Sequence, residues 1–379
     1  MTVLKPIKHI LLIGNFLALF RNISFCNSKL RVVIMILFAI VEISLTILNC
    51  VIIAYYHFYN NFADILQRYI ILFNSVLFIT FSCYYSNILK KLMISFEKNS
   101  SMFVEDSLYL KKIKMFERVT IFIFMLFVAL KVVYIGLNTM YYHKVEEGLP
   151  IFIILFIQLN SSLSNIRFFY EYCLMCTLLF VIADQLECIV RSMEKDINLV
   201  NGTYEMVETN NTNVIQDKIG RTAQWSKMYC CVAGETDIFN TIFSLQIFIM
   251  LITAILYMSI FLYAFTFLSV SGFKNTPILI NYALNIIITH IQILVLSKSA
   301  QRIKNNVKKI RCCLGRLLII SLQNHNWYRA TMDLLRFISK GQLRIQAFGS
   351  FIVDMSLPPT CILLFTSYTV IALQFNNVL

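Results

Sequence analysis

The chain has 379 residues, of which 58% are hydrophobic and 14% charged, and its formal net charge is +13. Soluble domains have about 45–50% apolar and about 25% charged residues, so this composition excludes an ordinary soluble protein and indicates a polytopic membrane protein. The positive charge does not require a nucleic-acid partner, because basic residues beside membrane spans orient helical membrane proteins. We therefore expect an all-α fold surrounded by membrane lipids, with no nucleic acid bound.

Residues 1–31 form a predicted cytosolic N-terminal segment around a short apolar run, His9 to Phe20. At about 12 residues this run is too short to span a bilayer, so we expect an interfacial or packed helix. Seven later stretches reach the roughly 20 apolar residues that a span needs. The predicted spans are 32–56, 65–89, 119–142, 150–170, 240–268, 277–297 and 355–379.

The distribution of lysine and arginine predicts the orientation of these spans. Of the 33 basic residues, 28 lie before the first span or in the connections 90–118, 184–237 and 298–350. The alternating connections contain only Lys144 and Lys274. The positive-inside rule therefore predicts a cytosolic N-terminus and, after seven crossings, an extracellular C-terminus. The glycosylation sequons at Asn22, Asn99, Asn201 and Asn210 all fall on the predicted cytosolic side, where they would stay unmodified.

The connections on the cytosolic side are long and contain amphipathic patterns, so we expect them to be helical. Residues 32–297 form a predicted six-helix bundle with cytosolic extensions at 90–118 and 171–239. Residues 298–354 form a predicted cytosolic helical anchor. The fourth span continues past Arg167 and Glu171, which stand one turn apart and can pair. We interpret these two charges as marking the inner membrane interface.

Two further charged residues lie inside predicted spans, Glu42 in the first and Lys131 in the third. Either alone near mid-bilayer costs at least about 2.5–3 kcal/mol. A buried ion pair between them is our first interpretation, and a role in coupling is the second.

Tyrosines and amides recur in the outer halves of spans two to six. Each needs a hydrogen-bonding partner or a cavity, and a few convergent polar groups within apolar walls are typical of a small-molecule pocket. We therefore predict that a part of this set binds a ligand. The candidates are Tyr69, Asn74, Tyr134, Asn138, Gln158, Asn160, Tyr257, Tyr263, Tyr282 and Asn285.

Catalytic and cofactor patterns are missing from the sequence. It contains no Gly-rich phosphate loop, Gly-x-Ser-x-Gly elbow or paired carboxylates, so we do not expect an enzyme. The five histidines have no metal-ligand spacing, so we expect neither a metal nor a cofactor.

The last span, 355–379, has polar residues at Thr360, Ser367 and Gln374, seven apart each time. This spacing drifts by only about 20° per step, so the three residues share one helix face. A polar stripe on an apolar helix faces water or the polar groups of another helix. Asp354 before the span is expected to cap the helix or to form an acidic ring at the inner mouth of a pore.

The same span resembles the C-terminal signature of insect gustatory receptors, Thr-Tyr, five hydrophobic residues and Gln-Phe. Ser367 and Tyr368 correspond to its start and Gln374 and Phe375 to its end. The resemblance implies a tastant-gated, non-selective cation channel, in which four subunits (a homotetramer or a heteromer with other gustatory receptors) surround a pore lined by the seventh helix. It implies the plasma membrane of chemosensory neurons as the location. The implied pore residues are Thr360, Ser367, Ile371, Gln374 and Phe375.

The ligand class stays open at this stage. A bitter or plant-derived compound is our first interpretation, and a sugar-responsive receptor or an odorant-receptor-type channel is the alternative. A G-protein-coupled receptor is disfavoured by the predicted orientation, and a transporter by the absence of repeated halves with broken helices.

Overall fold

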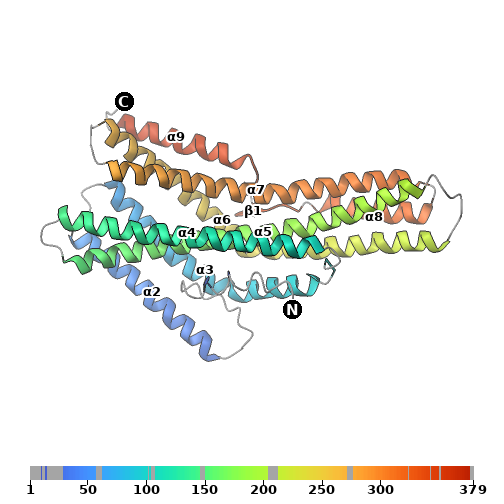
Figure 1. The fold of residues 1–379 in the computed structure, drawn as a ribbon, viewed down its shortest axis with the longest axis horizontal. Helices are drawn as coiled ribbons and strands as arrows, with labels where there is room; N and C mark the ends of the chain where they lie inside the picture. The colour runs from blue at the N-terminus through green and yellow to red at the C-terminus, as the bar shows by residue number, and fades with distance from the viewer. Residues whose placement is uncertain are drawn as a thin grey trace.

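The computed structural model describes residues 10, 13–14, 29–56, 62–100, 102–103, 107–145, 150–203, 212–270, 276–322, 324–341, 343–349 and 351–375. These residues form long helices and one short strand pair (Figure 1). In chain order the elements are α2 (Lys29–Tyr56), α3 (Phe62–Ser100), α4 (Ser107–Val145), α5 (Ile151–Thr203), α6 (Thr212–Val270), α7 (Thr276–Ser321), α8 (His325–Lys340), β1 (Gln346–Ala347), β2 (Phe351–Ile352) and α9 (Leu357–Phe375).

The predicted all-helical membrane fold is confirmed. Within the described parts of the chain, six helices (α3 to α7 and α9) are long and apolar enough to cross a membrane. Helix α2 contributes a shorter apolar stretch, Ile43–Ile52. All seven predicted spans fall in these seven helices, although the last helix begins at Leu357 rather than at residue 355.

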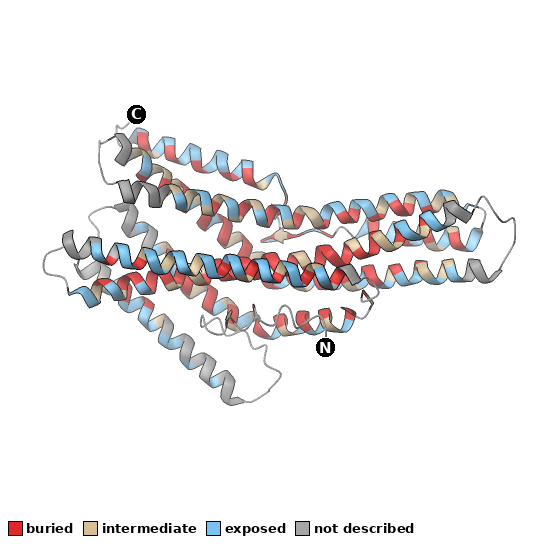
Figure 2. Cartoon of the chain, viewed as in Figure 1, coloured by how far each residue is buried: buried red, intermediate tan, exposed pale blue. Residues whose placement is uncertain are grey.

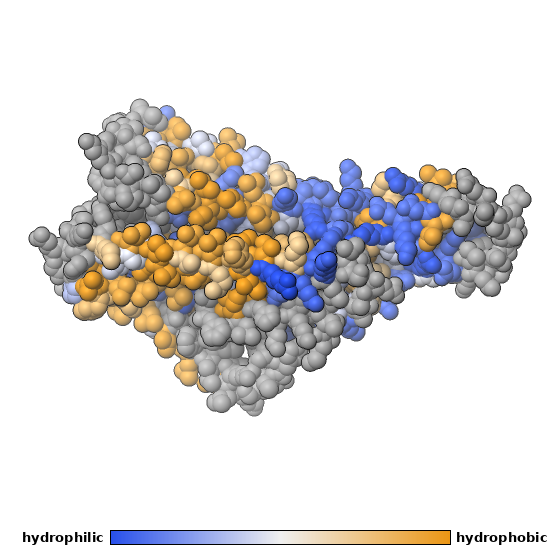
Figure 3. All heavy atoms as spheres, in the orientation of Figure 1, coloured by the Kyte–Doolittle hydropathy of each residue, from blue (hydrophilic) through white to orange (hydrophobic). Residues whose placement is uncertain are grey.

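The helices are much longer than a bilayer requires. Helix α5 has 53 residues and α6 has 59, which at 1.5 Å per residue is about 80–90 Å, against about 30 Å of hydrocarbon. One half of the molecule has a mainly apolar surface and the other a mainly hydrophilic one (Figure 3). We call them the membrane half, which includes α2 and α9, and the polar half, which includes α8. The polar half corresponds to the predicted cytosolic extensions.

Helix α5 lies at the centre of the fold. It contacts α2, α3, α4, α6 and α7, and its buried residues form a continuous band along the middle of the molecule (Figure 2). Every residue from Phe169 to Leu179 is buried, polar ones included. A helix that is buried all round belongs to a protein core rather than to a lipid-facing surface.

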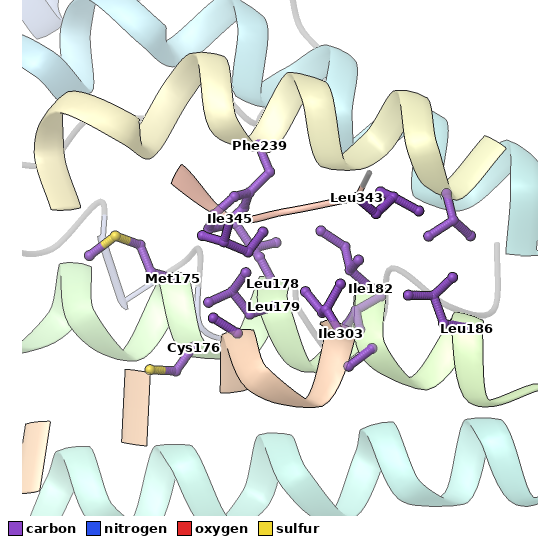
Figure 4. Packing of buried hydrophobic residues seen from close by; sticks show 14 of the residues in the cluster. Met175, Cys176, Leu178, Leu179, Ile182, Leu186, Phe239, Ile303, Leu343 and Ile345 are labelled. Carbon is purple, nitrogen blue, oxygen red and sulfur yellow. The ribbon is translucent and has the colours of Figure 1, made fainter. Parts of the chain in front are cut away.

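The main hydrophobic core extends from Phe365 of α9 to Trp327 of α8, and Figure 4 shows the part of it around α5. Residues of α5 spaced three and four apart meet side chains from α6, α7 and the segment before β1. Each fully buried aliphatic or aromatic side chain contributes about 1.5–3 kcal/mol. The labelled residues are Met175, Cys176, Leu178, Leu179, Ile182, Leu186, Phe239, Ile303, Leu343 and Ile345.

Helix α8 lies within the predicted anchor segment 298–354, and its sequence explains its fold. Asn324 is its N-cap, and the Asn324 side chain accepts a hydrogen bond from the backbone N–H of Trp327 at 3.0 Å. Trp327, Leu334 and Ile338 recur at helical spacing and are buried, so the helix presents one apolar face to α6 and α7. The predicted anchor segment is therefore packed structure, although its role as an anchor stays a prediction.

A small hairpin interrupts the all-helical pattern. Gln346 pairs with Ile352 and Ala347 with Phe351 in an antiparallel register. Phe348 and Gly349 turn the chain with positive φ angles of 52° and 69°. Strands of two residues are too short to give a period-two pattern, so the sequence did not indicate them.

The described residues test two further predictions only in part: the packed N-terminal apolar run and the unmodified glycosylation sequons. Ile10 is buried in the main core, and Gly14 lies against the ring of Tyr170, which agrees with a packed segment. Most of His9 to Phe20 lies outside the described residues. Asn99, which begins one of the sequons, is only 7% exposed and is not accessible to a glycan in the folded chain.

Candidate functional site

Helix α9 has one face against the subunit and one face away from it. Cys361, Phe365, Thr369 and Leu373 recur at every fourth residue and are buried against α6 and α7. The Thr369 hydroxyl donates to the carbonyls of Phe365, at 2.8 Å, and of Ser259 in α6, at 3.4 Å. Residues four apart share a helix face, so this row orients the rest of α9 outward.

The predicted pore residues lie on the outward part of α9. Thr360, Ser367, Ile371 and Gln374 are all exposed. Phe375 ends the helix, but its side chain lies outside the described residues. The four residues thus lie on a surface that the described part of the subunit does not cover. The spacing predicted a common face for Thr360, Ser367 and Gln374, and whether that surface lines a pore stays a proposal. Tyr368 of the signature is also exposed, at 58%.

Not every hydroxyl on this surface needs an outside partner. Thr360 donates to the carbonyl of Ser356 at 2.9 Å, and Ser367 to that of Leu363 at 2.8 Å. Such bonds to the preceding turn satisfy the hydroxyl donors within the helix. The Gln374 amide has two donors and a carbonyl acceptor, so it has the greatest need for water or for a polar neighbour.

The segment leading into α9 is tied to α6 and α7. Asn240 of α6 accepts from the Gln346 N–H at 3.2 Å and donates to the Arg344 carbonyl at 2.9 Å. Ser244, one turn later, accepts from the N–H of Phe348 through its carbonyl and from that of Gly349 through its hydroxyl. These bonds attach the chain just before α9 to α6.

Asp354 caps the turn before α9, as one of the two interpretations predicted. Its carboxylate accepts from the N–H of Ser356 at 3.0 Å and contacts the Lys304 ammonium at 3.0 Å. Hydrogen bonds from Ser356 and the charge of Lys304 lower the pKa of Asp354. The alternative role, an acidic ring at a pore mouth, needs several subunits and stays a proposal.

Two of the predicted ligand residues come together between α3 and α6. Asn74 and Tyr257 are both buried, at 3% and 8% exposure. The Asn74 carbonyl oxygen accepts from the Thr253 hydroxyl at 3.3 Å, whereas its amide nitrogen has no partner. Ile71 and Phe261 pack around Tyr257. The arrangement has the apolar walls and unsatisfied polar atom that a small-molecule site uses.

The other candidates are distributed around the bundle. Gln158 is fully buried in α5, whereas the Asn160 amide donates to the Leu45 carbonyl of α2 at 3.3 Å and so serves the α2 contact. Tyr69 is partly exposed, and Tyr263 and Asn285 are half-buried. The side chains of Asn138 and Tyr282 lie outside the described residues.

The structure describes only Lys131 of the predicted Glu42–Lys131 pair, because the Glu42 side chain lies outside the described residues. Lys131 is half-buried, and its ammonium lies 5.5 Å from the ring centroid of Phe127 and 5.3 Å from that of Tyr134. Cation–π contacts at such distances stabilise a partly buried cation. The ion pair stays a prediction.

A buried polar network around α5 was identified only in part from the sequence. Arg167 and Glu171 are fully buried. Arg167 donates to the Ser75 hydroxyl at 3.0 Å, and Glu171 accepts from Gln246 at 2.9 Å. These bonds join α3, α5 and α6 inside the bundle, and the position of the two charges at the inner membrane interface stays a prediction. Two charges one turn apart in an apolar run were the available signal.

Comparison with known proteins identifies the fold. No family model and no curated protein sequence matches the chain. Solved structures do match, among them the insect olfactory receptor OR5 from Machilis hrabei, with a TM-score of 0.68 and 14% identity, and the same receptor in complex with eugenol, with a TM-score of 0.72 and 13% identity. Each match covers 98% of both chains. The matched proteins are receptors, which agrees with the expectation that the chain is not an enzyme. At these identities the likeness shows the fold alone: this chain has the fold of an insect olfactory receptor.

Proposed function

We propose that this protein is a chemosensory receptor of the plasma membrane, an odorant-receptor-type cation channel opened by a small molecule. The observation that carries the proposal is the outward surface of α9, with Thr360, Ser367, Ile371 and Gln374, on a helix whose other face is packed against its own subunit. In a single subunit this surface would face lipid. In a ring of subunits it would face a shared axis.

A ring of four subunits accounts for the composition of α9. Side chains such as Gln374 would replace part of a cation's hydration, and apolar residues such as Ile371 would close the path by excluding water. Both a homotetramer and a heteromer bring α9 to the axis. The segment from Arg344 to Gly349, bound to Asn240 and Ser244 of α6, supports α6 as the element that moves α9.

The ligand is proposed to bind in the membrane half between α3, α5 and α6. Asn74, Tyr257 and Gln158 are buried there, and the Asn74 side chain lies beside the Tyr257 hydroxyl. The matched receptor in complex with eugenol supports a small aromatic compound with a hydrogen-bonding group. A ligand opens the channel only by binding the open arrangement more tightly than the closed one.

A gustatory receptor is the second candidate. Ser367, Tyr368, Gln374 and Phe375 resemble the gustatory signature, which favours a tastant, with a bitter or plant-derived compound ahead of a sugar. The shared fold does not separate taste from smell. The two candidates differ in ligand and cell type, and they share the channel mechanism.

The test is a cysteine-accessibility scan of α9 in cells that express the full chain. Eugenol, caffeine and sucrose are the probes, and the current is recorded before and after a membrane-impermeant, cationic thiol reagent. We expect the reagent to change the current of Thr360→Cys, Ser367→Cys, Ile371→Cys and Gln374→Cys. The matched controls on the packed face, Phe365→Cys, Thr369→Cys and Leu373→Cys, should respond like the wild type.

The outcomes separate the candidates. Reagent effects confined to the outward face support α9 as the pore lining, and the effective probe distinguishes an odorant-type from a taste ligand. Evoked currents that no outward cysteine alters contradict the pore role of α9. G-protein-dependent signalling without any current contradicts the channel itself.

A further inference from the structure

A buried acidic residue in the polar half has no role in the proposed channel. Glu235 of α6 is fully buried. It is not in the membrane half, because its contacts on α3, Ser95 and Asn99, lie beyond Lys90 and Lys91 on the cytosolic side. A carboxylate without water is expensive unless it is fully hydrogen-bonded or paired with a cation.

The hydrogen bonds of Glu235 satisfy only one of its two oxygens. Oε1 accepts from the Ser95 hydroxyl at 3.2 Å and from the Asn99 amide at 2.8 Å. Oε2 is buried and has no partner. An ionised carboxylate is only an acceptor, with room for about four hydrogen bonds, whereas a protonated one has its own O–H donor. The observed environment therefore suits the protonated form.

Other buried polar groups surround this carboxyl. Gln185 of α5 is fully buried and lies next to both Glu235 and Tyr109. The Tyr109 hydroxyl of α4 is buried, and Oδ2 of Asp184 is buried with no hydrogen-bond partner among the described residues. Four helices thus contribute polar groups to one buried cluster.

We propose that Glu235 and Gln185 form a proton-binding site inside the polar half. The proton resides on Glu235 Oε2, beside the Gln185 side chain. Ser95 and Asn99 hold the other oxygen. The bound proton removes a buried charge and fills an empty donor position, so it holds α3, α5 and α6 together. The ligand is cytosolic H⁺, and the site does not depend on α9 or on a pore.

The charged and titratable groups around the site agree with this assignment. Tyr109 on α4 and Asp184 and Cys188 on α5 face the same cluster, and Cys231 on α6 and Lys98 on α3 lie on its other side. Lys112 and Arg302 contact Asp184 rather than Glu235. Burial raises the pKa of Glu235 to about 7, while hydrogen bonds from Asn99, Ser95 and Gln185 lower it.

The direction of the pH effect follows from these values. Glu235 binds its proton more tightly in the folded chain, with a pKa of about 7, than in the unfolded chain, near 4.5. The stabilisation is therefore complete below about pH 4.5 and is lost as the pH rises through about 7. Within this window the unfolding equilibrium constant rises by up to about tenfold per pH unit. Burial also raises the pKa of Asp184, to about 6, so the wild type must be compared with a variant that lacks only Glu235.

The test uses the purified full chain in detergent, with thermal unfolding followed by tryptophan fluorescence from pH 5 to pH 9. Glu235→Gln mimics the protonated acid. We expect it to match the wild type at pH 5, to lose less stability up to pH 7, and to be more stable than the wild type at pH 8. Asp237→Asn, an exposed change two residues away on the same helix, is the matched control and should follow the wild type.

A second variant keeps the Glu235 carboxyl and changes the pH at which it titrates. Asn99→Ala removes a donor to the charged form, so the pH profile should shift to higher pH, a change that a purely structural defect would not produce. Asn305→Ala, exposed on α7, serves as its control. Identical pH profiles for the wild type and Glu235→Gln would overturn the proposal, and so would an Asn99→Ala profile that shifts downward or keeps its midpoint.

Discussion

Helices α5 and α9 are both apolar enough to cross a membrane, yet several polar side chains of α5 are buried and several of α9 are exposed. In α5, Arg167 and Glu171 are fully buried and bonded to α3 and α6. In α9, Ser367 and Gln374 are exposed on the surface of the subunit. The polar residues of α5 therefore bond to other helices of the same chain, whereas Ser367 bonds within α9 and Gln374 faces outward. This difference is why we locate structural stability in α5 and propose the permeation function for α9.

The largest effect is expected from Arg167→Ala in α5. It removes the donor to Ser75 and leaves Glu171 buried one turn away, and breaking such a network typically costs about 3–5 kcal/mol. We expect little monodisperse protein in detergent-based size-exclusion chromatography, and a lower melting temperature for what remains. Arg118→Ala, exposed on α4, is the control. A normal yield and melting temperature for Arg167→Ala would place the stability of the bundle elsewhere.

A smaller effect is expected from replacing one leucine in each of the two helices by alanine. Leu178→Ala removes a fully buried α5 side chain and should destabilise the subunit by about 2–5 kcal/mol. Leu363→Ala, at a position of α9 that is 68% exposed, should change subunit stability by at most about 0.5 kcal/mol. Thermal unfolding measures both variants.

The same two variants also test how the subunits assemble. Native mass spectrometry in detergent shows whether Leu363→Ala changes the fraction of assembled subunits while Leu178→Ala changes only their stability. That result would support an assembly contact on the outward face of α9. A loss of subunit stability by Leu363→Ala as large as that of Leu178→Ala would break the comparison, because it would mean that both faces of α9 belong to the subunit.

Much of the architecture could be predicted from the sequence because hydropathy and basic charge report directly on the membrane. The seven apolar stretches lie in α2 to α7 and α9, and the continuation of the fourth span beyond Glu171 is the second half of α5. Hydropathy does not report what a helix touches, however. Helix α4 is largely exposed and α5 almost entirely buried, although both are strongly apolar.

The candidate site could be predicted less completely, and the reason is geometric. The seven-residue spacing in α9 predicts a common face from helix geometry alone. Thr360, Ser367 and Gln374 are all exposed, and their role in a pore stays a prediction. The outer polar residues come from different helices, whose rotation a single sequence does not specify. Asn74 and Tyr257 therefore fall together, whereas Asn160 serves α2. The buried cluster around Glu235 had no sequence signal, because Asn99, Gln185 and Glu235 lie on three different helices and far apart along the chain.

The smallest effect tests the one buried polar residue on the packed face of α9. Thr369→Val keeps the shape of the side chain and removes a hydroxyl that donates to Phe365 and, at 3.4 Å, to Ser259. Both acceptors are helix carbonyls, so we expect a loss of about 0.5–1.5 kcal/mol at most, the net value of an ordinary hydrogen bond. Thr366→Val removes an equivalent bond to Ile362 on the exposed face and should cost less, because water or lipid headgroups can replace it near a surface. Equal melting temperatures for the two variants would mean that the Ser259 contact contributes nothing to seating α9. A larger loss of stability for Thr366→Val than for Thr369→Val would show that the outward face of α9 is covered in the assembled protein. That face would then be a contact between subunits and not a pore lining.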